Sequence, residues 1–280
     1  MATLAILGIA VVPMASAFES LPGGPHDDIT AAAVREAGMS EQTVDAVVEA
    51  VRDVDIRDNA LEPSADQVDR IDATEDYRPE HHCDRVPPAD DRSAFSAAAA
   101  FVANRSAAAV AAGRGGDPDA AMRHLGELLH AVQDCMSHSN AVDLADPQAV
   151  VQAINGHGAV PDGLRLTGFL PGADDPETPP GDPYPHASFA KDSEDKNDEA
   201  GLELPDGHTK FEAARELAID ASILALQDVL SQLTPEELQA LADAQADGGQ
   251  PIPRVGVPAP AWTFTMAAVA AAVAVARLRR

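Results

Sequence analysis

One predicted helix carries three side chains that can bind a metal ion, and all three lie on a single face. His130, Asp134 and His138 are spaced four residues apart in the segment LGELLHAVQDCMSHSN. Because an α-helix turns about 100° per residue, each step of four moves the side chain only about 40° around the axis. Leucine and valine residues flank this face and would turn it inward, where ionisable groups need compensation. Imidazole and carboxylate are ligands of divalent cations, so we favour a metal site, with a hydrogen-bonded structural network as the alternative.

Further histidine and acidic residues occur in four groups elsewhere in the chain. These groups are His208 with Glu212 at a helix start, the run His81–Asp84 after a proline-containing loop, His26 at the first predicted helix, and Asp55 with Asp58 at the end of the second. A single His/Glu pair at this spacing is more often a surface pair, but several groups in a chain with nine histidines favour a shared metal centre. The remaining histidines are predicted to be surface or loop residues: His124, His157 and His186.

The segment Leu129–Asn140 resembles, almost residue by residue, a motif that reads LHxxQDxxSHSN. This motif belongs to the Het-C-like branch of the superfamily that contains the zinc-dependent phospholipases C and the fungal single-strand nucleases. Shorter segments are similar to other motifs of the superfamily and follow in the same order: His26–Thr30 to HxxI, His82–Asp84 to the second metal segment, and Gly207–Glu212 to the closing HxxxE pair. The matches run from residue 18 to about residue 230. The resemblance implies an all-α bundle that holds up to three zinc ions.

The resemblance also implies ligands for each zinc ion. The implied ligands of the first ion are His82, His130, Asp134 and one acidic residue, either Asp55 or Asp58, with Asp69 or Asp72 as replacements. Those of the second ion are His138, His208 and Glu212. Those of the third ion are His26, Asp134 and the amine and carbonyl of Phe18, which cleavage of a signal peptide would place at the N-terminus. Asp84 is a further candidate metal ligand, because it lies in the second metal segment.

The chemistry that such a centre implies is the hydrolysis of a phosphoester. Clustered zinc ions lower the pKa of bound water and clamp a phosphate between them. We therefore expect an enzyme of phospholipase C type, in which a metal-bound hydroxide attacks phosphorus and Asp55 or Asp58 orients the water. One alternative is a non-catalytic Het-C-like module that keeps zinc for structure. The others are a phosphodiesterase similar to the single-strand nucleases and a helical bundle without metal.

The two cysteines each follow an implied ligand of the first zinc ion. Cys83 follows His82, and Cys135 follows Asp134. If these ligands bind one ion, the cysteines lie close together, and an exported compartment permits a disulfide. We predict a Cys83–Cys135 bridge that replaces an aromatic contact of the family and joins two metal segments. Two buried free thiols, or Cys83 as an additional soft ligand, are the alternatives.

Helical periodicity dominates the rest of the chain and predicts an all-α domain over residues 18–246. The predicted helices cover residues 28–37, a segment capped by Ser40, residues 93–112, a segment from Pro118 through at least Asp134, residues 208–232, and a short segment after Thr234. Residues 155–207 are rich in Gly, Pro and Asp and are predicted to be irregular. Such a long irregular insertion in a helical domain is usually functional or disordered.

Both ends of the chain contain apolar segments that predict export and attachment to a membrane. Residues 1–17 are similar to a signal peptide with an A-x-A cleavage site. Residues 247–260 are predicted to be a Pro/Gly linker, and residues 261–280 a transmembrane anchor or a sorting tail that is later removed. A buried core helix is the alternative for this last segment. The arginines that close the chain place the domain on the extracellular face.

The net charge of −27 restricts the partners that the domain can bind. It argues against a stable nucleic-acid partner, because no basic stripe exists to displace counterions from phosphates. Lipid headgroups or other small phosphoesters fit better than long polyanions. Only three residues are lysines: Lys191, Lys196 and Lys210. An acidic chain with few lysines favours either a halophilic source or a GC-rich genome and a solvated acidic face.

Overall fold

The computed structural model describes residues 23–58, 78–169, 182–194 and 198–238, and these residues form helices joined by irregular segments. The helices are α1 (Pro25–Glu36), α2 (Glu41–Asp58), α3 (Pro79–His82), α4 (Asp91–Gly115), α5 (Pro118–Ser137), the 3₁₀ turn η1 (Ala141–Asp143), α6 (Gln148–Ile154), α7 (His186–Phe189) and α8 (Lys210–Leu230). No β-strand occurs in the described ranges, where extended segments pair only through isolated bridges. The predicted all-α class is therefore confirmed, whereas the predicted signal peptide, linker and C-terminal anchor lie outside the described residues.

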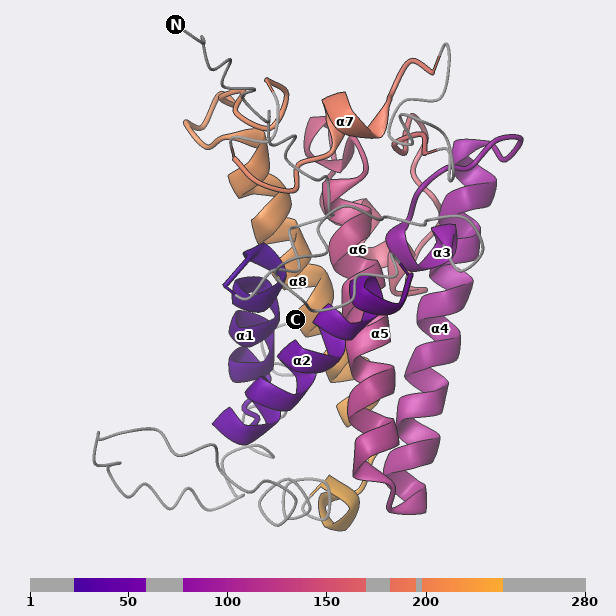
Figure 1. Ribbon diagram of the computed structural model, residues 1–280, viewed down its shortest axis with the longest axis vertical. Helices are drawn as coiled ribbons and strands as arrows, with labels where there is room; N and C mark the ends of the chain where they lie inside the picture. Colours follow the sequence, from indigo (N-terminus) through magenta and orange to yellow (C-terminus); the bar gives the residue numbers. More distant parts are fainter. Residues whose placement is uncertain (1–22, 59–77, 170–181, 195–197, 239–280) are drawn as a thin grey trace, which may run out of the picture.

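Helix α5 lies at the centre of the bundle and packs against α2, α4 and α8, while α1 packs against α2 and α8 (Figure 1). Every residue of α5 from Leu125 to Ser137 is buried. Leu125, Leu129 and Val132 belong to the hydrophobic core. Because the core surrounds this helix on all sides, its polar residues are buried as well, and they require partners within the protein.

The three longest helices, α4, α5 and α8, begin at residues whose side chains cap the helix. Asp90 accepts a hydrogen bond from the backbone of Ser93 at α4, and Asp117 accepts one from Ala120 at α5, where Pro118 occupies the first turn. Thr209 and Glu212 form a reciprocal capping box at α8. These caps satisfy backbone N–H groups that the first helical turn leaves without partners.

Helices α2 and α5 are in close contact at Gly126, and this contact allows a test of the packing. A Cβ atom added to Gly126 would lie 2.5 Å from the carbonyl carbon and the Cβ of Ala50. We expect Gly126→Ala to push α2 away from α5 and to lower the free energy of unfolding by about 1–3 kcal/mol. Gly115→Ala is the matched control, because no atom lies within 4 Å of the added carbon. Equal midpoints of urea denaturation for the two variants would contradict this packing.

Three extended segments lie side by side and connect the irregular part of the chain to the helices. Arg85 pairs with Gly168, and Gly168 pairs with Pro185. The Arg85 N–H donates to the Thr167 carbonyl (2.9 Å), and the His186 N–H donates to the Gly168 carbonyl (3.2 Å). The Arg85 guanidinium also donates to both carboxylate oxygens of Asp182. These contacts fix the residues after α3, those before α7 and those around Gly168 relative to one another.

Helix α4 is the one helix of the described ranges whose length and apolar composition would also suit a membrane span. Core helices of globular domains share these properties, and Phe95, Ala98 and Val102 of α4 are buried against the bundle.

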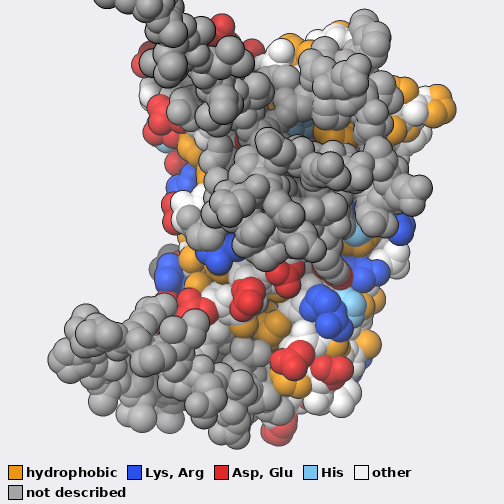
Figure 2. All heavy atoms as spheres, in the orientation of Figure 1, with side chains coloured by type: hydrophobic (Ala, Val, Ile, Leu, Met, Phe, Trp, Pro, Cys, Tyr) orange, Lys and Arg blue, Asp and Glu red, His pale blue; other side chains and the backbone are white. Residues whose placement is uncertain are grey.

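Acidic side chains occur at several separate places on the face drawn in Figure 2, among apolar and basic ones. This distribution is typical of a solvated acidic surface.

Candidate metal centre

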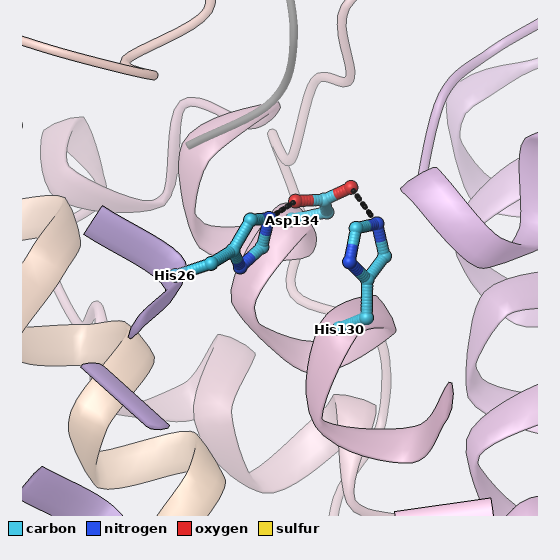
Figure 3. A group of neighbouring side chains, drawn as sticks. All are labelled: His26, His130 and Asp134. Atoms are coloured by element: carbon cyan, nitrogen blue, oxygen red, sulfur yellow. Dashed lines mark ion pairs between the residues drawn. The ribbon is translucent and has the colours of Figure 1, made fainter. Parts of the chain in front are cut away.

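The first cluster consists of His26 from α1, His82 from α3, and His130 and Asp134 from α5. Asp134 lies between two of the imidazole rings, and each of its oxygens faces one of them (Figure 3). Its Oδ1 lies 3.1 Å from Nε2 of His26, and its Oδ2 lies 3.0 Å from Nε2 of His130. All three side chains are 0% exposed. The helical spacing predicted His130 and Asp134 on one face, and the bundle adds His26 to them from α1.

His82 completes this cluster from the side of α3. Its Nδ1 lies 3.0 Å from Oδ2 of Asp134 and 3.2 Å from Nε2 of His130. Ligand nitrogens about 2.1 Å from a tetrahedral zinc ion lie about 3.4 Å from each other. The separation of the two imidazole nitrogens is therefore close to the one that a shared metal ion requires.

The second cluster lies beyond the C-terminal end of α5 and consists of Asp84, His138, His186 and Asp192. Nε2 of His138 lies 3.0 Å from Nε2 of His186 and 3.2 Å from Oδ1 of Asp192. The Ser137 hydroxyl donates to the same oxygen of Asp192 at 2.7 Å. Asp84, His138 and His186 each offer a ligand atom within 4.8 Å of the others. Two imidazoles and carboxylates therefore converge here in a buried position.

The other nitrogen of His138 faces acceptors, and this orientation determines which nitrogen can bind a metal. Nδ1 of His138 lies 2.7 Å from the His82 carbonyl oxygen and 3.3 Å from Oδ1 of Asp84. Because a carbonyl oxygen only accepts, Nδ1 must carry a proton and donate it. In the neutral ring the lone pair is then on Nε2, which faces His186 and Asp192. Asp84 is in turn held by the Thr167 hydroxyl, which donates to it at 2.6 Å.

Opposite charges within each cluster shift the pKa of its members. Burial opposes ionisation of the Asp134 carboxyl, but His130, His26 and His82 outweigh it and hold the pKa well below its ordinary value. Burial also opposes the charge of His138, but Asp84 and Asp192 raise the pKa of this imidazole well above its ordinary value. Burial would raise the pKa of Asp84, but His138 and His186 lower it. A cation bound between these histidines would stabilise the buried anionic carboxylates.

A disulfide joins two of the segments that contribute residues to both clusters, as predicted. Cys83 is bonded to Cys135 with a Cα–Cα distance of 5.0 Å, and both residues are fully buried. Cys83 separates His82 of the first cluster from Asp84 of the second, and Cys135 follows Asp134 directly. The free-thiol and soft-ligand alternatives for these cysteines are therefore wrong. Cys83 has a φ of 53°, a left-handed conformation that is uncommon outside glycine.

His208 and Glu212 are not brought to His138, although the family resemblance implies them as its partners. The His208 side chain is 47% exposed and lies 3.9 Å from Glu216. Glu212 is exposed, and its carboxylate accepts hydrogen bonds from the backbone and hydroxyl of Thr209. The reason is local: the capping box uses Glu212 to begin α8, so its carboxylate points back along its own helix.

Two residues of the second cluster were missed by the sequence analysis. His186, predicted to be a surface or loop residue, is 4% exposed, and Asp192 is 0% exposed. Both lie in the segment 155–207, whose unusual length was the one signal that it has a function.

Of the other predicted site residues, Phe18, Asp69 and Asp72 lie outside the described residues. The described part of α2 includes the backbone of Asp55 and Asp58 but not the positions of their side chains.

Comparison of the chain with family models, with curated proteins and with solved structures finds no match. The imidazole nitrogens and carboxylate oxygens of both clusters are the donor set that a divalent cation such as zinc takes in proteins. Buried His/Asp clusters that could hold a metal ion are thus present, and they fit the expected ion in donor chemistry.

Metal binding at the second cluster should release protons, because His138 holds a proton to unusually high pH. The raised pKa of His138 means that a cation must displace this proton near neutral pH. We expect the apparent affinity to rise by up to about tenfold per pH unit while pH is below this pKa. Calorimetric titration in buffers of different ionisation enthalpy measures the released protons. Binding without proton release at pH 7 would contradict the protonation of His138.

Proposed function

We propose that this protein is a zinc-dependent phosphoester hydrolase of phospholipase C type that acts outside the cell at a membrane. The observation that carries the proposal is the presence of two buried imidazole–carboxylate clusters, one at the C-terminal part of α5 and one directly beyond its end. Segment His82–Asp84 serves both clusters: the His82 ring contacts Asp134, and the His82 carbonyl accepts from His138. Neighbouring metal sites of this kind suit a reaction in which one phosphate contacts more than one cation.

The proposed ligands are divided between the clusters. The first cluster would hold metal with His26, His82, His130 and Asp134, and the second with His138, His186 and Asp192. Bound zinc would supply Lewis acidity toward the phosphoryl oxygens and would lower the pKa of water. The chain itself contributes an ionised Asp134 that offers one oxygen to each side of the first cluster. Asp84 lies on the Nδ1 side of His138 and would keep Nε2 directed toward the cation.

The proposed substrate is a small phosphoester such as a lipid headgroup. The net charge of −27 would repel a long polyanion at low salt. The disulfide supports export, because such bonds persist in oxidising compartments. Attachment to the membrane rests on the apolar segment 261–276 and the arginines that follow it, and this part of the proposal comes from the sequence.

One observation favours the alternative of a non-catalytic module stabilised by zinc. The side chains proposed as ligands are all at most 4% exposed. A structural site is closed, whereas a catalytic site keeps a position open for water or substrate. In such a module the same ligands would bind zinc and no phosphoester would be hydrolysed.

Hydrolysis of bis(p-nitrophenyl) phosphate by the zinc-loaded protein tests the proposal. We expect turnover that His130→Ala lowers by more than about 100-fold, because the variant lacks a ligand at the first cluster. His157→Ala is the matched control, since His157 is 42% exposed and pairs with Asp228 at the surface. Full zinc content without turnover of this substrate or of a short-chain phospholipid would favour the non-catalytic module. Turnover unchanged in His130→Ala would contradict the proposed site.

A further inference from the structure

A buried side-chain amide of α5 contacts a proposed ligand of the first cluster but is not itself one of the proposed ligands. Gln133 is 0% exposed and precedes Asp134. Its Oε1 lies 2.6 Å from Nδ1 of His26. Its Nε2 donates to the hydroxyls of Thr30 at 3.0 Å and Ser222 at 3.2 Å. The side chain therefore connects α1, α5 and α8 in a fully buried polar network.

The partners of Gln133 determine the orientation of its amide. The Ser222 hydroxyl donates its only proton to the Ala218 carbonyl at 2.7 Å, so toward Gln133 it can only accept. The amide NH₂ must therefore face Ser222 and Thr30, and the amide oxygen must face His26. Because this oxygen carries no proton, the hydrogen bond between Gln133 and His26 has Nδ1–H of His26 as its donor.

This hydrogen bond fixes the proton of His26 on the side opposite to Asp134. A neutral His26 with its proton on Nδ1 has its lone pair on Nε2, the atom that lies 3.1 Å from Oδ1 of Asp134. A lone pair and a carboxylate oxygen at this distance repel each other unless a proton or a cation lies between them. The arrangement thus presents two donor atoms to a cation.

We propose that Gln133 is a positioning residue for the metal site of the first cluster, and that it acts by holding His26 in the tautomer that directs the Nε2 lone pair toward a cation beside Asp134. The proposal rests on the metal-dependent function proposed above. Gln133 itself does not touch the ion. Its contribution is to orient the ring and select the tautomer, a role that partners of ligating histidines have in many metal sites.

Gln133→Met tests this role, because it keeps the length of the side chain and removes the acceptor. Two quantities are measured: the protonation of each His26 nitrogen by ¹⁵N NMR of the metal-free protein at pH 8, and the zinc affinity of each cluster by competition with a chelator. In the wild type we expect a proton on Nδ1. In Gln133→Met we expect a mixture of tautomers and a 10–100-fold loss of affinity at the first cluster. The second cluster is the internal control and should keep its affinity.

Gln133→Glu and Ser222→Ala separate positioning from folding. The glutamate keeps an acceptor for Nδ1–H and should restore the wild-type tautomer and most of the affinity, whereas Ser222→Ala should cause a smaller loss than Gln133→Met. If Gln133→Met does not fold, Ser222→Ala carries the test with the same two readouts. A wild-type Nδ1 without a proton, an unchanged affinity in the tested variant, or a lost affinity with an unchanged tautomer would each overturn the proposal. The tautomer is read without metal, so a wild type that binds no zinc overturns the proposed function separately.

Discussion

His186→Ala should remove one tightly bound metal ion from the protein and leave the first cluster loaded. Nε2 of His186 lies 3.0 Å from Nε2 of His138 in a buried site, and no other histidine of the described residues reaches that position. Loss of a partner outside the ligand set typically lowers metal affinity by 10–100-fold, so loss of a ligand should lower it by more than about 100-fold. Elemental analysis after dialysis against a weak chelator measures the effect.

His208→Ala is the matched control, because the family resemblance implies this histidine as the ligand and the structure places it at the surface. We expect its metal content and affinity to equal those of the wild type. The pair of variants therefore compares the two ligand assignments directly. Loss of metal in His208→Ala with full retention in His186→Ala would contradict the assignment of His186 to the second cluster.

Removing the disulfide should lower both the stability of the fold and the metal affinity of the two clusters. The bridge closes a loop with a sequence separation of 52 residues, and a loop of this length corresponds to about 4 kcal/mol of chain entropy in the unfolded state. The segments that it joins include His82, Asp84 and Asp134. When these segments are released, their side chains must be ordered at the moment of metal binding, so we expect affinity at both clusters to fall.

Cys83→Gly combined with Cys135→Ala is the suitable double variant. Glycine adopts the φ of 53° without the cost that another residue would have, so the variant removes the bridge without straining the backbone. Urea denaturation of the metal-free proteins should show a loss of about 2–5 kcal/mol relative to the oxidised wild type. Treatment of the wild type with a reducing agent should reproduce the loss. Unchanged stability of the double variant, with unchanged zinc affinity, would contradict the role of the bridge.

Two residues of the first cluster, His130 and Asp134, could be predicted from helical spacing because they lie on one regular helix, whereas His82 and His26 were implied only by the family resemblance, which assigned His26 to a different ion. Spacing by four places His130 and Asp134 on one face, and the apolar residues around them indicate that this face is buried. The cysteines could be paired because each follows a residue of that cluster. Helical periodicity is a local property, so it is readable without knowledge of the tertiary structure.

The second cluster could not be assembled from the sequence for the opposite reason. His186 and Asp192 reach His138 through an irregular segment held by single bridges at Arg85 and Gly168. Isolated bridges of this kind leave no periodic pattern in the sequence. The position of Glu212 did have a local signal, since Thr209-x-x-Glu212 has the spacing of a capping box. The same spacing occurs at Thr234, where Thr234 and Glu237 exchange the same hydrogen bonds at the start of the short helical segment that was predicted there. A carboxylate that accepts hydrogen bonds at the start of its own helix is not available as a metal ligand.

The number of zinc ions bound by the protein tests the metal centre most directly. Protein purified without added chelator, loaded with zinc and then dialysed, should retain at least two zinc ions per chain when measured by elemental analysis and native mass spectrometry. His130→Ala and His186→Ala should each lose about one ion, because each removes a ligand from a different cluster. Fewer than one retained ion per chain in the folded, oxidised wild type would contradict the assignment of the clusters as metal sites.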